Sequence, residues 1–86
     1  MNRTINILLV DDDLKNSMLL KRFLEVEGYC VTYANNGAIG WELYHTSNPD
    51  LILLDINMPE MNGFELAKKI REINKKVLIF FLTDRT

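Results

Sequence analysis

Short runs of aliphatic, aromatic and β-branched residues recur at near-equal intervals, and they constrain the fold of this chain more than any other feature. They occupy residues 5–10, 29–34, 51–56 and 77–82. The first, third and fourth runs are almost continuously apolar. Such strands are typical of a parallel sheet covered on both faces, whereas half-exposed antiparallel strands alternate apolar and polar residues. The pattern therefore predicts four strands of a parallel sheet.

The segments between these runs have the pattern of amphipathic helices, predicted over residues 14–27, 38–45 and 63–73. Asp12 or Asp13 can cap the start of the first helix, Gly28 supplies its stop signal, and Asn62 can cap the third. The inward-facing residues predicted by the helical period are Leu19, Leu20, Phe23 and Leu24, then Gly40, Trp41 and Tyr44, and finally Leu66, Ala67, Ile70 and Ile73.

Alternation of strands and helices with crossovers of this length predicts right-handed βαβ units. The resulting architecture is a three-layer, doubly wound α/β sheet. The chain continues for only four residues after the fourth run. Because a doubly wound sheet needs helices on both faces, we expect residues 1–86 to form one domain that is incomplete at its C-terminus.

Composition argues against several classes of function. Ten Lys and Arg against twelve Asp and Glu give a formal net charge of −2. The chain therefore has no strong basic field, and we expect no direct nucleic-acid binding. The run at 5–10 is too short for a signal-peptide core or a membrane span. Cys30 is the only cysteine, and its apolar surroundings predict a small core residue in a reducing, cytoplasmic setting.

Carboxylates follow two of the predicted strands. Asp11, Asp12 and Asp13 come directly after the first strand, and Asp55 lies near the end of the third. If these parallel strands are neighbours, the carboxylates converge in the crevice where open α/β sheets bind ligands. Two charges about 4 Å apart repel by roughly 4 kcal/mol at an effective dielectric near 20. A hard divalent cation relieves this repulsion, and oxygen ligands with retained waters suit Mg²⁺.

Three blocks of sequence carry a resemblance to a known family. They are residues 7–13 (ILLVDDD), residues 49–63 (PDLILLDINMPEMNG) and the apolar run that ends at Thr83, with Asn36-Gly37 between the first two. In this order and spacing the chain resembles the receiver domain of two-component response regulators. The resemblance implies a flavodoxin-like fold with strand order 2-1-3-4, in which the family's fifth strand and last two helices are absent.

The resemblance also implies a function in phosphorelay signalling. Asp55 is expected to accept a phosphoryl group from a histidine kinase or phosphotransfer protein. Asp11 and Asp12 are expected to hold Mg²⁺ together with Asp55 and the backbone carbonyl of Asn57. The hydroxyl of Thr83 would hydrogen-bond the phosphoryl group. By this resemblance the chain is a phospho-accepting module that supports its own phosphotransfer and dephosphorylation, rather than an enzyme.

Two features depart from the family pattern. Asp84 follows Thr83 where receiver domains normally have a small residue, and its charge opposes a phosphoryl dianion if the side chain points inward. The absent C-terminal elements carry the family's Lys, which pairs with the phosphoryl group. They also carry the face that most members use for output and dimerisation.

Other interpretations stay open on sequence alone. The chain could be a fragment that only self-assembles, through residues 77–82 and a sheet face that no helix covers. It could also be a metal-dependent aspartyl-phosphate hydrolase, which turnover of a phosphate ester would identify. Taken singly, the run 11–13 could be a solvated turn that caps a helix, and Asp55 an ordinary strand-end residue. Their joint placement favours the phosphoryl acceptor.

Overall fold

The computed structural model of the 86-residue chain describes residues 3–82, in which strands and helices alternate from β1 to β4. In chain order the elements are β1 (Asn6–Val10), α1 (Leu14–Val26), β2 (Cys30–Ala34), α2 (Gly37–Ser47), β3 (Leu51–Asp55), α3 (Gly63–Ile73) and β4 (Leu78–Leu82). Every predicted element is present, and its ends lie within two residues of the expected ones.

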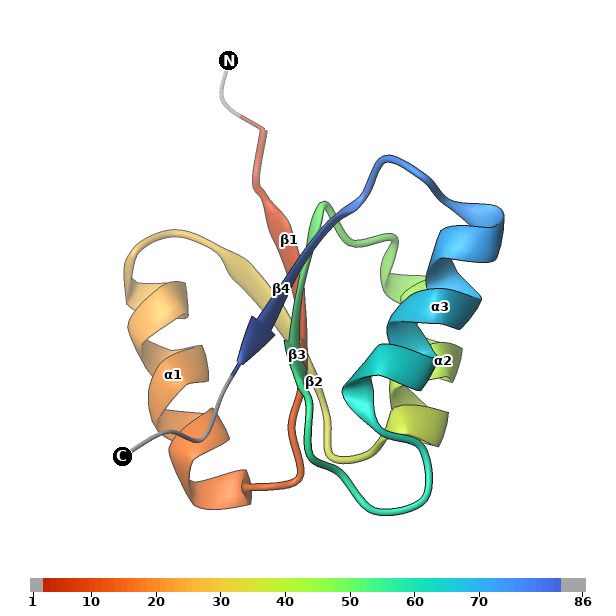
Figure 1. The fold of residues 1–86 in the computed structure, drawn as a ribbon. Helices are drawn as coiled ribbons and strands as arrows, with labels where there is room; N and C mark the ends of the chain where they lie inside the picture. The colour runs from red at the N-terminus through yellow and green to blue at the C-terminus, as the bar shows by residue number, and fades with distance from the viewer. Residues whose placement is uncertain (1–2, 83–86) are drawn as a thin grey trace.

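The four strands form one parallel sheet in the order β2-β1-β3-β4. Helix α1 lies on one face of this sheet, and α2 and α3 lie together on the other (Figure 1). Right-handed crossovers produce this arrangement because the order along the sheet reverses between β2 and β3. The predicted flavodoxin-like, three-layer architecture is therefore confirmed.

Two apolar clusters hold the layers together, one on each face of the sheet. The larger cluster packs β1 and β3 against α2 and α3, and its fully buried members are Leu8, Val10, Ile52, Leu54, Leu66 and Ile70. The smaller cluster lies under α1 and centres on Ile7, Leu9 and Val31. Burial on both faces explains why β1 has an almost continuously apolar sequence.

Several predicted core residues are exposed instead. In α1, Leu20 and Leu24 pack on the sheet, but Leu19 and Phe23 are more than 60% exposed, because the helix contacts the sheet along a stripe narrower than its apolar face. Ile73 is exposed because it is the last residue of α3, beyond the buried stripe that ends at Ile70. Cys30 is also exposed, since it opens an edge strand rather than a central one.

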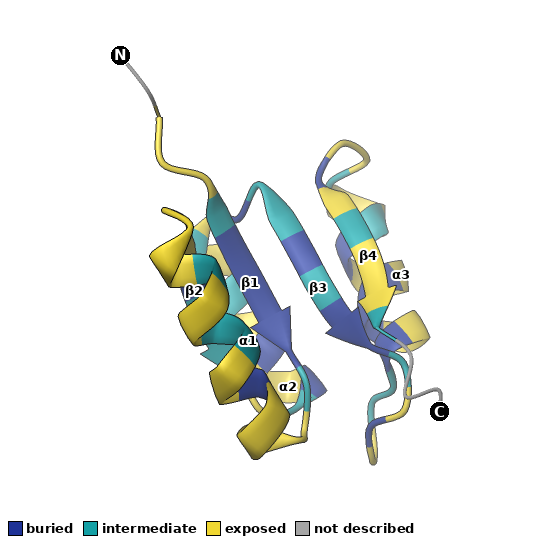
Figure 2. Cartoon of the chain, turned by 90° about the vertical axis from the view of Figure 1, so that its left-hand side faces the viewer, coloured by how far each residue is buried: buried dark blue, intermediate teal, exposed yellow. Residues whose placement is uncertain are grey.

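Strand β4 is the least covered part of the sheet. It pairs with β3 on one side, and within residues 3–82 nothing pairs with its other side. Leu78 and Phe80 are each more than half exposed. They lie on the face that carries α1, because their strand partners Leu51 and Leu53 pack against the cluster under that helix. Figure 2 shows β4 largely exposed on this face. The sheet face that we expected no helix to cover, over the third and fourth strands, is bare at β4. At β3 the expectation is wrong, because Leu51 and Leu53 are partly buried against the cluster under α1.

Helix α3 begins at a capping box next to the end of β3. Asn62 Oδ1 accepts a hydrogen bond from the backbone N–H of Glu65 at 2.9 Å, and Glu65 Oε1 accepts one from the N–H of Asn62 at 2.9 Å. These two bonds satisfy backbone donors that a helix start leaves unpaired. The predicted capping role of Asn62 is confirmed.

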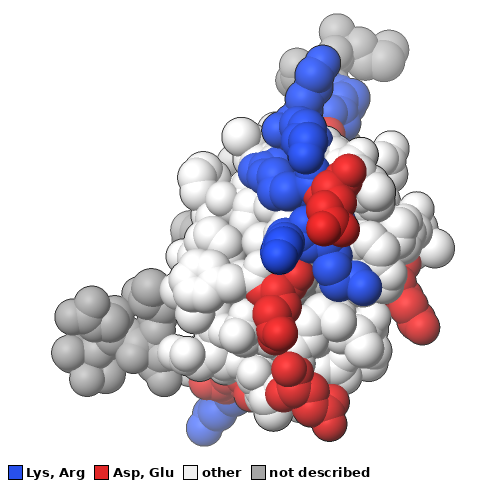
Figure 3. Space-filling model, turned by 45° about the vertical axis from the view of Figure 1, so that its right-hand side comes forward, with Lys and Arg blue, Asp and Glu red and all other residues white. Residues whose placement is uncertain are grey.

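No helix within residues 3–82 combines the length and the apolar character that a membrane crossing requires. The exposed surface of α3 carries both signs of charge, with Glu65, Lys68, Lys69 and Glu72 facing outward. Figure 3 shows basic and acidic side chains side by side on the face that includes this helix, without a broad field of one sign.

We predict that Asn62→Ala lowers the free energy of unfolding by about 1 kcal/mol, because it removes the cap of α3. Lys75→Ala is the control: Lys75 is exposed, caps no helix, and its replacement should change stability by less than about 0.5 kcal/mol. Chemical denaturation at one protein concentration measures both. Equal losses in the two variants would contradict the assigned role of the capping box.

Candidate functional site

The register of the sheet brings the ends of β1 and β3 together. Val10, the last residue of β1, is aligned with Leu54 of β3. Asp11 follows Val10, and Asp55 follows Leu54, so the two aspartates leave neighbouring strands at the same edge. The backbone N–H of Asp11 donates to the carbonyl of Ala34 at 3.1 Å, which fixes Asp11 to β2 as well.

Three carboxylates meet at this edge. Asp11, Asp12 and Asp55 each offer one oxygen atom, and these three oxygens lie within 4.8 Å of one another. Asp55 is only 8% exposed, Asp11 is half-buried and Asp12 is exposed. A cavity of about 460 Å³ opens over them, lined by Asp11, Asp12, Asp13, Asn16, Asp55, Asn57 and Leu82. The arrangement joins one buried carboxylate to two that solvent can reach.

Asp13 has a different role from its two neighbours. Its Oδ1 accepts a hydrogen bond from the backbone N–H of Asn16 at 3.1 Å, and its Oδ2 accepts one from Asn16 Nδ2 at 2.7 Å. Asp13 is thus the N-cap of α1, one of the two caps that the sequence allowed. Its backbone N–H donates to Asp11 Oδ1 at 2.9 Å, which orients the carboxylate of Asp11.

The loop after β3 is built tightly around Asp55. The backbone N–H of Asn57 donates to Asp55 Oδ1 at 3.2 Å, and the N–H of Gly63 donates to the carbonyl of Ile56 at 3.0 Å. A Cβ atom on residue 63 would overlap the carbonyl oxygen of Asp55, so only glycine fits there. The close return of the chain at Gly63 holds the end of β3 in place.

Burial raises the pKa of Asp55 to about 6. The negative charges of Asp11 and Asp12 act in the same direction, while the N–H of Asn57 opposes them by stabilising the ionised form. A carboxylate with such a pKa holds its proton more readily than an ordinary one. It gains most from a cation that would offset the neighbouring charges.

The donor set fits Mg²⁺. All three converging side chains supply carboxylate oxygens, which hard divalent cations prefer. Partial exposure of Asp11 and Asp12 also leaves room for the waters that Mg²⁺ retains.

Of the other predicted site residues, the structure describes Asn57 but not Thr83 or Asp84. Asn57 lines the cavity and is exposed. Thr83 and Asp84 lie outside the described residues. Sequence reasoning missed Tyr33, whose hydroxyl donates a hydrogen bond to the backbone carbonyl of Asp11 at 2.7 Å. Its position one residue before the end of a predicted strand was the available signal, but the bonding partner depends on tertiary structure.

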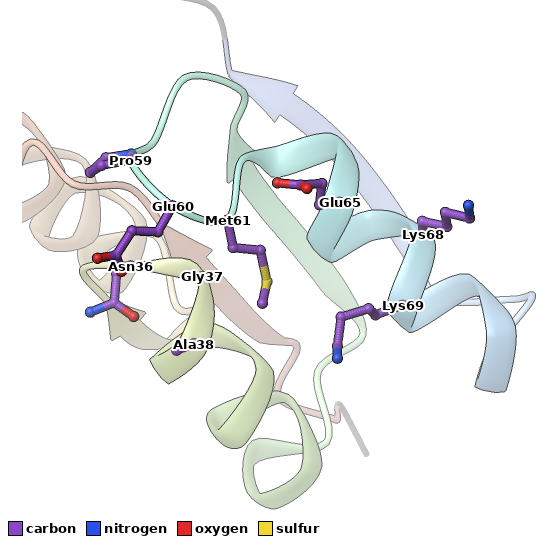
Figure 4. A pocket seen from close by; sticks show the side chains of 9 residues that line it. All are labelled: Asn36, Gly37, Ala38, Pro59, Glu60, Met61, Glu65, Lys68 and Lys69. Atoms are coloured by element: carbon purple, nitrogen blue, oxygen red, sulfur yellow. The ribbon is translucent and has the colours of Figure 1, made fainter.

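A second cavity, of about 570 Å³, lies between the start of α2, the loop after β3 and α3 (Figure 4). Its lining residues are Asn36, Gly37, Ala38, Pro59, Glu60, Met61, Glu65, Lys68 and Lys69. Met61 reaches from the loop toward α2, and a Cβ atom on Gly37 would come within 2.9 Å of it. This contact fixes the loop against α2, and the cavity shares no residue with the carboxylate cluster.

A sheet of this order with three carboxylates at the ends of β1 and β3 defines a receiver-type α/β domain. The chain matches the family "Response regulator receiver domain" over residues 7–86, and it belongs to that family. The transcriptional regulatory protein RprY of Bacteroides fragilis is 35% identical over 86 residues. The match covers 100% of this chain and 36% of RprY, so the chain spans about a third of that relative's length.

Solved structures give the same result. Chemotaxis protein CheY4 of Vibrio cholerae superimposes with a TM-score of 0.92 at 31% identity, over 98% of this chain and 72% of CheY4. Response regulator TrrA of Thermotoga maritima, solved in complex with Mg²⁺-BeF, has a TM-score of 0.90 at 38% identity, over 96% of this chain and 72% of TrrA. TrrA has also been solved in complex with the histidine kinase ThkA.

Because the pKa of Asp55 is raised, we expect ionisation of this carboxyl to lower the free energy of unfolding. The folded chain holds the proton more tightly than the unfolded chain, so stability falls as the pH rises from about 4 to about 6 and stays lower above that range. In the absence of divalent metal at pH 7.5, Asp55→Asn should therefore raise the free energy of unfolding by about 1–3 kcal/mol. Denaturant titration at pH 4 and pH 7.5 measures this.

Asp50→Asn is the matched control, and we expect it to change the free energy of unfolding in the opposite direction. The Arg3 guanidinium and the backbone N–H of Asn6 lower the pKa of Asp50 to about 2, so its ionised form stabilises the fold above pH 4. Removing that charge should destabilise the chain at pH 7.5. Destabilisation by Asp55→Asn under the same conditions would show that the cluster does not strain Asp55.

Proposed function

We propose that this chain acts in phosphorelay signalling by accepting a phosphoryl group on Asp55 from a histidine kinase or phosphotransfer protein. Mg²⁺ would be held by Asp11, Asp12 and Asp55, with the backbone carbonyl of Asn57. The observation that carries the proposal is a buried carboxylate whose immediate neighbours are two further carboxylates. The complexes of the related TrrA with Mg²⁺-BeF and with a histidine kinase support it.

The reaction requires Asp55 in its ionised form. A carboxylate oxygen of Asp55 attacks phosphorus in line, an O–P bond forms, and the P–N bond of the phosphohistidine breaks. The electron pair of the broken bond stays on the histidine nitrogen. The other ring nitrogen carries a proton, so the imidazole leaves in its neutral form. When bound, Mg²⁺ would offset the negative charge of the carboxylates and of the phosphoryl oxygens.

The two oxygens of Asp55 are not equivalent. Oδ1 accepts the backbone N–H of Asn57, so its lone pairs are partly engaged. Oδ2 receives no hydrogen bond from the described residues. We assign Oδ2 as the attacking atom, with Oδ1 held by Asn57 to fix the plane of the carboxylate. The hydroxyl of Thr83 is proposed to donate to the phosphoryl group once it is attached.

Incubation with acetyl phosphate and Mg²⁺ should add one phosphoryl group to the chain, detected as a mass increase, and EDTA should prevent it. Asp55→Asn should abolish the modification. Asp13→Asn is the matched control, because Asn is also a good helix cap and Asp13 lies outside the cluster. The control should stay modifiable.

A modified Asp55→Asn protein would refute the assignment of the acceptor. Turnover of an exogenous phosphate ester, many molecules per chain, would instead identify a hydrolase. The same mass measurement, combined with an assay of released phosphate, separates these outcomes.

We also propose that the 86-residue chain self-associates through β4, with a second copy as the occupant of its free side. Leu78, Phe80 and Phe81 are 56%, 55% and 40% exposed. The strand contains no charge or proline that would block edge pairing. Burying the exposed parts of these three side chains offers each copy about 2–4 kcal/mol.

Sedimentation velocity between 1 and 100 µM tests this association, and the wild-type chain should shift from monomer toward dimer or larger species. Phe80→Lys should weaken association because it places a charge on the strand edge. Phe23→Lys is the control, since Phe23 is similarly exposed but belongs to α1. A cooperatively folded monomer throughout this range would show that β4 needs no partner.

A further inference from the structure

A tyrosine on β2 holds the backbone of the acidic turn. Tyr33 Oη donates to the carbonyl oxygen of Asp11 at 2.7 Å, across a separation of 22 residues in sequence. The neighbouring backbone bond, from the N–H of Asp11 to the carbonyl of Ala34, measures 3.1 Å. Both polar groups of the Asp11 backbone are therefore bonded to β2.

These bonds act where the chain leaves the regular sheet. Asp11 is the first residue after β1, and Asp12 and Asp13 follow it into the turn that starts α1. The carbonyl of Asp11 belongs to the peptide plane that leads into Asp12. A donor at this carbonyl consequently fixes the direction in which the backbone of Asp12 departs.

The side chain of Tyr33 is well suited to this task. It is half-buried and packs against the apolar cluster under α1. A tyrosine hydroxyl is a neutral donor in the physiological pH range.

We propose that Tyr33 is a positioning residue for metal binding, which sets the backbone of Asp11 and Asp12 so that their carboxylates face Asp55. The inference rests on the proposed Mg²⁺ site. Tyr33 would contact neither the bound Mg²⁺ nor the phosphoryl group. It acts through one hydrogen bond to the backbone of a ligand residue.

The test compares Tyr33→Phe with wild type and with Tyr44→Phe. Tyr44 is the matched control because its half-buried hydroxyl also makes one hydrogen bond, accepting from Asn74 Nδ2 at 3.0 Å, but far from the cluster in the packing of α2 against α3. Mg²⁺ binding is measured directly by calorimetry, and Mn²⁺ binding by electron paramagnetic resonance. Unfolding is measured in parallel for all three proteins.

Tyr33→Phe should weaken Mg²⁺ binding about threefold to tenfold, the usual effect of one lost hydrogen bond near a ligand. The rate of modification by acetyl phosphate at saturating Mg²⁺ should stay within about twofold of wild type, while the Mg²⁺ concentration for half-maximal rate rises. Tyr44→Phe should bind Mg²⁺ like wild type.

Unchanged Mg²⁺ affinity in Tyr33→Phe would overturn the inference while leaving the proposed function intact. Equal weakening in Tyr33→Phe and Tyr44→Phe would also overturn it, because the effect would then follow general packing. Failure of the wild-type chain itself to bind Mg²⁺ would refute the metal site, and the role of Tyr33 with it.

Discussion

Repulsion among three carboxylates at one edge of a parallel sheet is the constraint on which the site depends. Parallel pairing of β1 with β3 places Asp11 and Asp55 at adjacent strand ends, and the turn adds Asp12. The two strands are held in register by backbone bonds and by cores on both faces of the sheet. The fold therefore imposes a charge cluster that isolated side chains would avoid, and a cation or a proton is the available means of relieving it.

Local structure around the cluster limits how far it can relax. The close fit of Gly63 against the backbone of Asp55 lets its N–H bond the carbonyl of Ile56, and this bond restrains the loop after β3. Asp13 is drawn away from the cluster because it caps α1, and its N–H orients Asp11. Tyr33 fixes the backbone carbonyl of Asp11. Each contact is ordinary in strength, and together they keep one buried and two accessible carboxylates facing the same cavity.

Much of this organisation could be predicted from the sequence because it depends on local pattern. Apolar runs, helix caps and turn residues located every element, and the strand-end positions of Asp11, Asp12 and Asp55 indicated their convergence. The predictions of burial that were wrong concern residues whose exposure depends on where their element lies in the sheet. The exposure of Cys30 follows from the edge position of β2, and that of Phe23 from the narrow contact of α1. The hydrogen bond from Tyr33 joins β2 to the turn after β1, and the hydrophobic pattern of the sequence does not show that these two segments are close in space.

We infer that the fold strains Asp55 electrostatically and that a divalent cation relieves the strain. A carboxyl ¹³C NMR titration of Asp55 measures this directly. Without divalent metal we expect a pKa of about 6, well above the ordinary value for Asp. With saturating Mg²⁺ the pKa should fall below that ordinary value. A metal-free pKa near 4, or a titration that Mg²⁺ leaves unchanged, would show that the cluster does not strain Asp55 in this way.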